Sequence, residues 1–225
     1  MSTASNKPYS EVLVIDVCDT LFKSNTTFDF VDYLLGNTNR LRHQFFLLIT
    51  SRLSPAFYTL ELLGKVTGID VIRRLVIFLL RGYPKNMVEQ WATDFMEDFL
   101  MPRLNTEVLQ ILQHRKSSKR FLISSSVEPV VKAIAHRLNV GYYASGLEER
   151  NGVITGRMSM DLTGKKHHVV EAINLTTPIH QLVVVTDNKS DYRLVEMAQE
   201  RFVVVYSEEK KNFWRPLNPK FILLD

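Results

Sequence analysis

The sequence predicts an α/β protein, a doubly wound parallel sheet with an inserted α-helical module, on three observations. Nearly continuous apolar runs of strand length recur along the chain, as strands covered on both faces require. Helical patterns separate these runs, and this alternation is typical of a parallel sheet. A long stretch between the first two runs shows only helical patterns. The apolar runs are residues 12–16, 121–124, 182–186 and 202–205.

The elements of the sheet and its helices follow in chain order. The run VLVID at 12–16 is expected to form the first strand, and FLIS at 121–124 the second. Between residues 147 and 158, Asn151-Gly152 separates two extended segments and predicts a β-hairpin. The two later runs are expected to form the third and fourth strands. Helices are expected at residues 127–138, 166–175 and 190–201.

Residues 27–108 break this alternation. They contain no clear strand run, and patterns such as LRHQFFLLITSRL and DVIRRLVIFLLRG are helical. Glycines and prolines punctuate the stretch. We therefore expect a helical cap at 27–108, whose aromatic and leucine stripes form its own core, and an α/β core made of residues 1–26 and 109–225. The basic run at 114–120 is expected to be a solvated loop.

Composition excludes several classes of protein. With 225 residues, 45% hydrophobic and 23% charged, the chain is neither collagen-like, low-complexity nor disordered. Its single cysteine, Cys18, excludes a disulfide framework and favours a reducing compartment. The start MSTASNKPYSEV lacks the apolar stretch of a secretory signal. The longest apolar runs, 75–80 and 45–49, are far shorter than the roughly 20 residues that span a bilayer. We expect a cytoplasmic protein.

The positive charge is concentrated in one region. The whole chain carries a formal net charge of +4, but residues 40–85 hold eight Lys or Arg against only Glu61 and Asp70. This segment therefore carries +6 and the rest of the chain −2. A local basic excess indicates a surface that meets an anionic partner, such as phospholipid or a phosphorylated substrate. A solvated helix face is an equally good explanation, and we expect no nucleic acid as a partner.

Three of the expected strands end in polar side chains. Asp16 ends the first, three serines from Ser124 end the second, and Asp187 and Asp191 follow the third. In open α/β sheets, ligands bind at the carboxyl ends of the strands. Carboxylates that meet there would supply oxygen ligands for Mg²⁺, and hydroxyls at a helix start suit a phosphate. Lys166, which opens the helix before the third strand, would add a fixed positive charge.

In this order the motifs resemble those of the haloacid dehalogenase superfamily of aspartate-nucleophile phosphohydrolases, especially its phosphoserine-phosphatase-like branch. The first motif of that family, D-x-D-x-T-[LV], appears as DVCDTL at 16–21. The second matches FLIS, the third-motif lysine matches Lys166, and the fourth, an apolar strand before D-x-x-x-D, matches Asp187 and Asp191. The hairpin at 147–158 is similar to one that this branch carries before its lysine. The resemblance covers nearly the whole chain and implies a Rossmann-like core with a helical cap.

The resemblance also implies a role for each of these residues. Asp16 would attack phosphorus and form an aspartyl-phosphate, which water then hydrolyses. Mg²⁺ would neutralise charge on the transferred oxygens. Catalytic roles are implied for Asp16, Cys18 and Lys166, phosphate binding for Thr20, Ser124, Ser125 and Lys166, and metal binding for Asp16, the backbone carbonyl of Cys18, Asp187 and Asp191.

Cys18 departs from the family pattern. Family phosphatases place a second Asp two residues after the nucleophile, where it protonates the leaving group and activates water. A thiol is a weak hydrogen-bond donor, and beside carboxylates we expect it to stay neutral. Three alternatives follow: a slow phosphatase or one whose leaving group needs no proton, an enzyme that uses Asp19 instead, or an idle site. A small buried filler without a chemical role is an equally good explanation of Cys18.

The leading hypothesis is a Mg²⁺-dependent phosphomonoester hydrolase that acts on a small phosphorylated substrate. One alternative is a haloacid dehalogenase, which also lacks the second Asp, although Asp187 argues against it. The other is a weak or inactive binding or regulatory protein on the same scaffold.

The substrate class is less defined. Asn25 stands where phosphoserine phosphatases carry a substrate-binding Glu, which disfavours phosphoserine. The basic cap, rich in Leu and Phe, is similar to the caps of family members that act on lipid phosphates. We therefore expect a lipid or sugar phosphate, with peripheral contact to anionic membrane lipid.

Overall fold

The computed structural model describes residues 11–223, so most of the N-terminal segment examined for a secretory signal lies outside it. Six strands form one sheet in the order β3-β2-β1-β6-β7-β8, and all neighbours are parallel. The strands are β1 (Val12–Ile15), β2 (Lys119–Val127), β3 (Gly141–Ser145), β6 (Leu182–Thr186), β7 (Glu200–Val205) and β8 (Lys220–Leu223).

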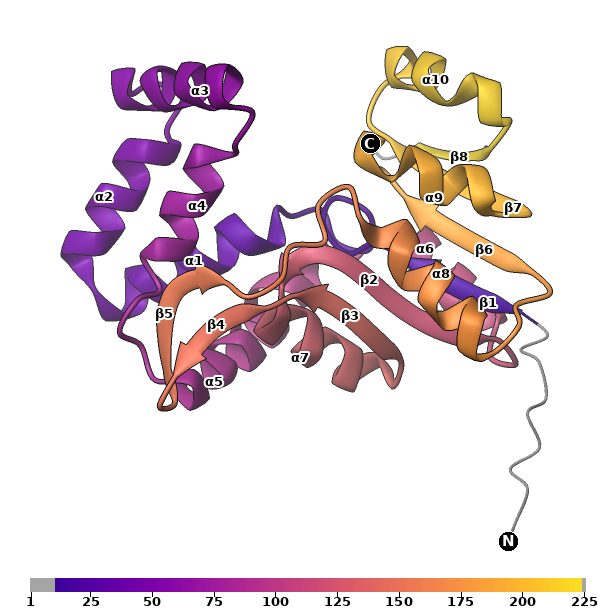
Figure 1. Ribbon diagram of the computed structural model, residues 1–225, viewed down its shortest axis with the longest axis horizontal. Coiled ribbons are helices and arrows are strands. Elements are labelled where there is room, and N and C mark those ends of the chain that lie inside the picture. Colours follow the sequence, from indigo (N-terminus) through magenta and orange to yellow (C-terminus); the bar gives the residue numbers. More distant parts are fainter. Residues whose placement is uncertain (1–10, 224–225) are drawn as a thin grey trace, which may run out of the picture.

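Helices cover both faces of this sheet (Figure 1). Leu13 and Ile15 of β1 belong to one buried apolar cluster, which also contains residues of the helices α6 (Thr106–His114) and α7 (Glu128–Leu138). Val12 and Val14 belong to a second cluster on the opposite face. The helices there are α8 (Lys166–Thr176), α9 (Tyr192–Met197) and α10 (Glu208–Trp214). Successive strand residues point to opposite faces, so β1 is buried on both, and the predicted doubly wound fold is confirmed.

The expected elements differ from the observed ones mainly at their ends. The run at 182–186 is a strand, the run at 12–16 is a strand up to Ile15, and those at 121–124 and 202–205 lie inside longer strands. The helix expected at 190–201 is present but shorter than expected. A 3₁₀ turn precedes the short α9, and Ala198 is already extended, because the chain must enter β7, where Arg201 pairs with Val184. The solvated loop expected at 114–120 is shorter, since β2 begins at Lys119.

The predicted hairpin is present as β4 (Leu147–Arg150) and β5 (Val153–Met158). Asn151 and Gly152 between them have φ values of 52° and 76°. Two successive left-handed residues are what a two-residue hairpin turn requires. Gly156 of β5 has φ +81°, and a Cβ on it would lie 2.9 Å from the carbonyl oxygen of Phe78. The hairpin therefore packs tightly against the helical segment.

The helical segment contains α1 (Thr26–Thr38), α2 (Arg40–Thr50), α3 (Pro55–Thr67), α4 (Val71–Phe78) and α5 (Lys85–Phe95). In Figure 1, α2 and α4 extend away from the sheet, and α3 lies across their far ends. A one-turn π-helix and a 3₁₀ turn follow α5. No helix within residues 11–223 is long and apolar enough to cross a bilayer.

The boundary expected after residue 108, between the cap and the α/β core, stays a prediction. Helix α5, inside the expected cap, packs against α7 of the expected core. Lys132 of α7 binds Glu89 of α5 at 2.9 Å, and Arg137 binds Glu97 at 3.2 Å. Apolar residues of α5 also belong to the buried cluster that contains β1. The segment that stands clear of the sheet is therefore the α2–α4 part.

Candidate active site

The strand order brings the predicted site residues to one edge of the sheet. Strand β1 lies between β2 and β6, so Asp16, just past the end of β1, is flanked by the ends of the strands that carry Ser124 and Asp187. Parallel strands all end at the same edge, which explains why three distant segments meet. Asp16 is buried, and the Val17 N–H donates to its Oδ1 at 2.7 Å.

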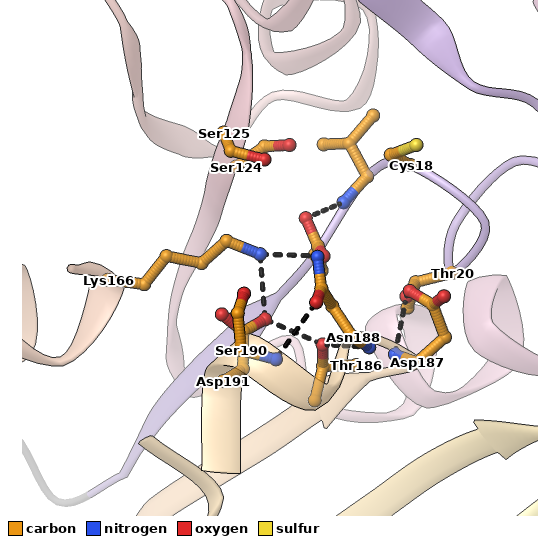
Figure 2. Close-up of polar contacts among 12 residues, drawn as sticks. Cys18, Thr20, Ser124, Ser125, Lys166, Thr186, Asp187, Asn188, Ser190 and Asp191 are labelled. Carbon is orange, nitrogen blue, oxygen red and sulfur yellow. Dashed lines mark hydrogen bonds and ion pairs between the residues drawn. The ribbon is translucent and has the colours of Figure 1, made fainter. Parts of the chain in front are cut away.

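Lys166 occupies the centre of this group (Figure 2). Its ammonium lies 2.6 Å from Asp16 Oδ2 and 2.7 Å from Asp191 Oδ2, and the Lys166 side chain is almost completely buried. The Thr186 hydroxyl donates to the same Asp191 oxygen at 2.7 Å. Burial alone would lower the pKa of Lys166, but the two carboxylates raise it above its ordinary value. Lys166 is therefore a permanent buried cation.

Asp187 is held by Thr20, which is part of the first motif. The Thr20 hydroxyl donates to Asp187 Oδ1 at 2.8 Å, and the Asp187 backbone N–H donates to Thr20 Oγ1 at 2.9 Å. Burial, followed by the charge of Asp16, raises the pKa of Asp187 to about 7. Two carboxylates thus lie within electrostatic range of each other, and a bound cation would stabilise both in their charged form.

These residues fit a divalent cation by two further criteria. Asp191 Oδ1 is buried and has no hydrogen-bond partner within the described part of the chain. Burial also raises the pKa of the Asp191 carboxyl. The available donors are carboxylate oxygens and the backbone carbonyl of Cys18, and hard oxygen donors of this kind suit Mg²⁺.

Ser124 and Ser125, in the last part of β2, lie on the side of Lys166 away from Asp191 in Figure 2. Ser124 is fully buried, and its Oγ accepts the Ser126 N–H at 3.2 Å. Ser125 instead lines a cleft of about 580 Å³. The core contributes Cys18, Asp19, Asn25 and Asn188 to this cleft, and the helical segment contributes Gly68, Ile69, Asp70, Arg73 and Arg74. The strand-end groups therefore adjoin a cleft whose opposite wall comes from the helical segment.

Cys18 and Asp19 both line this cleft, although adjacent side chains usually point to different sides. Asp19 has a left-handed φ of 51°, a conformation that non-glycine residues seldom adopt. The hydroxyl of Tyr206 donates to the Asp19 carbonyl at 2.6 Å and holds this turn. The Cys18 Sγ lies 3.7 Å from Asp19 Oδ2. Burial, then the nearby carboxylates Asp19 and Asp16, raises the pKa of the thiol, so Cys18 is neutral near pH 7.

Sequence analysis missed Arg73 and Tyr206. Arg73 of α4 donates to the Ser125 carbonyl at 2.5 Å and to Asp161 Oδ1 at 3.0 Å, joining the helical segment to β2 and to the chain after β5. Tyr206 follows β7, which is not among the strands whose ends carry the motifs. Neither residue belongs to a motif, and both reach the site through contacts more than 50 residues apart in sequence.

The sequence profile of the haloacid dehalogenase-like hydrolases matches residues 13–196. This match covers most of the chain, so the chain belongs to that family, as the motifs predicted, and the expected hydrolase class is confirmed. No curated protein sequence matches the chain.

Solved structures show the same fold. A protein of unknown function from Bordetella pertussis Tohama I has a TM-score of 0.76 at 14% identity, over 95% of this chain and 98% of its own. A HAD family hydrolase from Salmonella enterica serovar Typhi has a TM-score of 0.66 at 16% identity, over 96% of this chain and 68% of its own. A phosphoserine phosphatase, solved as an analogue of its phospho-aspartyl intermediate, has a TM-score of 0.58 at 16% identity, over 96% of this chain and 93% of its own.

Proposed function

We propose that this chain hydrolyses phosphate monoesters with Asp16 as its nucleophile and Mg²⁺ as its cofactor. The observation that carries the proposal is the contact between Asp16 and Lys166 at 2.6 Å, beside Asp187 and at the shared end of three parallel strands. A carboxylate, a fixed cation and a second carboxylate in this arrangement suit attack on a phosphate dianion. Family membership and the structural likeness to phosphoserine phosphatases support the same class of reaction.

In this mechanism an Asp16 oxygen forms a bond to phosphorus while the bond to the ester oxygen breaks. The departing alkoxide takes a proton from a water molecule in the cleft and leaves as the alcohol. Water then attacks the phosphorus of the aspartyl-phosphate, which releases inorganic phosphate and restores Asp16. Lys166 and the Ser124 hydroxyl would hold the phosphate oxygens, with Ser125 at the cleft side and Thr20 keeping Asp187 in place. Mg²⁺, held by Asp16, the Cys18 carbonyl, Asp187 and Asp191, would neutralise charge on the transferred group.

Cys18 favours a second candidate function, a phosphate-binding protein with little turnover. The neutral thiol beside Asp16 is a poor proton donor, and general acid–base help contributes roughly 10²–10⁴ in rate. The substrate class we propose is a lipid or sugar phosphate, because Asn25 lines the cleft where a carboxylate would bind an amine. The single cysteine supports a cytoplasmic location.

A substrate panel with and without Mg²⁺ tests the proposal. It should contain an aryl phosphate, phosphoserine, sugar phosphates and a short-chain lipid phosphate. We expect Mg²⁺-dependent release of phosphate and acid-stable labelling of the protein, both absent in Asp16→Asn because an amide is a far poorer nucleophile. Phosphate binding to the wild type without any release or labelling would favour the second candidate. Metal-independent turnover that survives Asp16→Asn would contradict both.

A further inference from the structure

Helix α3 exposes an apolar face that no other segment within residues 11–223 covers. None of its residues, Pro55–Thr67, is buried. Tyr58, Leu62 and Val66 are four residues apart and therefore lie along one side of the helix. Their exposed fractions are 58%, 64% and 78%, values unusual for large apolar side chains that follow one another on a single face.

Neighbouring leucines extend this face. Leu53, in the turn before α3, is 96% exposed, and Leu63 is also exposed. We call these five residues the apex patch: Leu53, Tyr58, Leu62, Leu63 and Val66. Figure 1 shows α3 at the end of the helical segment that lies farthest from the sheet, so the apex patch is on a projecting tip.

The inner side of α3 already provides its packing. Leu60 packs against the buried cluster of the protein, and Phe57 is half-buried. Gly64 allows the close approach of the next segment, since a Cβ there would lie 2.9 Å from the carbonyl oxygen of Ile69. The apex patch is therefore not needed to attach α3, and its apolar residues are available to an external partner.

A second copy of this chain does not fit the patch well. A helix of 13 residues is about 20 Å long and about 10 Å wide, which gives roughly 200 Å². A stable interface buries about 800 Å² on each partner. The helices around the patch, residues 40–85, carry a formal +6, of which Arg73 and Lys85 are paired with Asp161 and Glu149 outside the segment. The remaining excess is positive, so two such segments would repel each other.

An anionic bilayer matches both the shape and the charge. A projecting apolar tip can enter a flat interface without a complementary groove. Arg52 stands next to Leu53 and is exposed. Lys65, between Leu63 and Val66 in sequence, is also exposed and pairs with Glu61 at 3.0 Å, a surface ion pair that a lipid phosphate can replace. Basic residues beside an interfacial apolar face bind the phosphates of acidic lipids. We propose that the apex patch docks this protein on the surface of a membrane that contains anionic phospholipid.

The apex patch lies on the helix that leads into one wall of the cleft, so docking would influence which substrates reach the site. Gly68 directly follows α3, and Gly68, Ile69 and Asp70 line the candidate active-site cleft. A tip seated in the interface would hold one wall of the cleft next to the lipid headgroups. The substrate class that fits is a phosphate monoester carried by a membrane lipid, and this step rests on the proposed function.

Co-sedimentation with vesicles tests the docking. The full chain should sediment with vesicles of phosphatidylcholine and phosphatidylglycerol and much less with phosphatidylcholine alone. Binding should weaken in about 1 M salt, where the Debye length is about 3 Å. Equal sedimentation with both kinds of vesicle, or none with either, would overturn the proposal.

Paired variants separate the apolar and the basic contributions. Leu62→Gln/Val66→Gln should weaken binding roughly tenfold at low and at high salt. Arg52→Gln/Lys65→Gln should weaken it roughly tenfold at low salt only. Leu175→Gln is the matched control, because Leu175 is an 88% exposed leucine on α8, a helix of the α/β part of the chain and not of the helical segment. It should bind as the wild type does. Equal losses in Leu175→Gln, or a dimer that Leu62→Gln/Val66→Gln dissociates, would overturn the proposal.

Activity on two substrates distinguishes this inference from the proposed function. All the variants should hydrolyse a soluble aryl phosphate at the wild-type rate, since none is in the site. Phosphatidic acid presented in the anionic vesicles should be hydrolysed roughly tenfold more slowly by Leu62→Gln/Val66→Gln. Vesicle binding without activity on either substrate would remove the lipid-phosphate substrate together with the proposed function but uphold the docking. Activity on aryl phosphate without vesicle binding would overturn the docking alone.

Discussion

Lys166 and Asp16 form an ion pair of 2.6 Å in which both side chains are buried. Asp191 adds a second carboxylate at 2.7 Å from the same ammonium. Taking charges out of water is costly, and the attraction between them compensates only when the partners are all present. The arrangement is therefore poor as a source of stability. Its two carboxylates around one ammonium leave a net negative charge, which suits a site that must first receive a cation.

Replacement of Lys166 should affect stability and activity together. Lys166→Met leaves Asp16 and Asp191 buried without their cation, so we expect the free energy of unfolding to fall by about 3–5 kcal/mol. Phosphatase activity should fall at least about 10²-fold, because the fixed charge that would hold the phosphate is lost. Urea unfolding and steady-state kinetics measure the two effects. The exposed ion pair of Lys65 with Glu61 is the control, and Lys65→Met should change stability by less than about 1 kcal/mol. Similar losses in the two variants would contradict this account.

The raised pKa of Asp187, about 7, predicts a pH-dependent stability of the metal-free protein. The folded state binds this proton more tightly than the unfolded state does. The stabilisation is therefore present below the ordinary carboxyl pKa of about 4 and is lost as the pH rises through about 7. The melting temperature in a chelator should fall between about pH 5 and about pH 8. Added Mg²⁺ should restore it above about pH 7, where Asp187 is charged.

Asp187→Asn identifies the responsible group. The amide has no proton to lose, so the decline around pH 7 should disappear, and the stabilisation by Mg²⁺ should shrink. Asp191, whose pKa burial also raises, should keep a part of the decline. An unchanged pH profile in Asp187→Asn would assign the decline to another residue.

The parts of the fold that sequence predicted are those fixed by local pattern. Strands β1 and β6 are buried at every residue, so their apolar runs are continuous. Strands β3 and β8 lie at the two edges of the sheet and have mixed burial, which leaves no such run to detect. For the site, the ends of the predicted strands were enough to identify Asp16, Ser124 and Asp187, because the sheet topology alone brings these residues together. Arg73 could not be found this way, because its position depends on how the helical segment packs over the core.

Arg73 should stabilise that packing. Its guanidinium contacts Asp161, the Thr163 hydroxyl at 2.7 Å and the Ser125 carbonyl at 2.5 Å. Arg73→Ala should lower the free energy of unfolding by about 1.5–3 kcal/mol, the usual range for hydrogen bonds to charged groups. KM should rise more than kcat falls, because the cleft wall moves while Asp16 stays in place. Arg73→Lys should restore little of the lost stability, since one ammonium group cannot replace a planar guanidinium with several donors.

Arg74 provides the comparison for Arg73, because it lines the same cleft from the next position of α4 and is exposed. Arg74→Ala should leave the free energy of unfolding within about 0.5 kcal/mol of the wild type. Chemical denaturation of the two variants side by side measures the difference. Equal stability of Arg73→Ala and Arg74→Ala would show that the contacts of Arg73 do not hold the helical segment.

The chemistry at Cys18 is the most specific expectation. If the neutral thiol limits the reaction, Cys18→Asp should raise the turnover of an alkyl phosphate roughly 10²-fold, the lower end of general acid–base effects. The gain should be smaller for an aryl phosphate, whose leaving group needs less protonation. For the same reason the wild type should accumulate aspartyl-phosphate on Asp16, since water activation is also weak. Rapid-quench labelling and steady-state kinetics on the two substrates measure these effects.

The controls for Cys18 decide between a missing carboxylate and a mere change of size. Cys18→Ser removes the thiol without adding a carboxylate, so it should leave turnover near the wild-type value. Cys18→Asp in an Asp16→Asn background should be inactive, because the new carboxylate can assist a nucleophile but not replace it. A wild type that already hydrolyses alkyl phosphates rapidly, with no gain in Cys18→Asp, would contradict this account. Asp19 would then be the proton donor, since its carboxylate lines the same cleft 3.7 Å from the Cys18 sulfur.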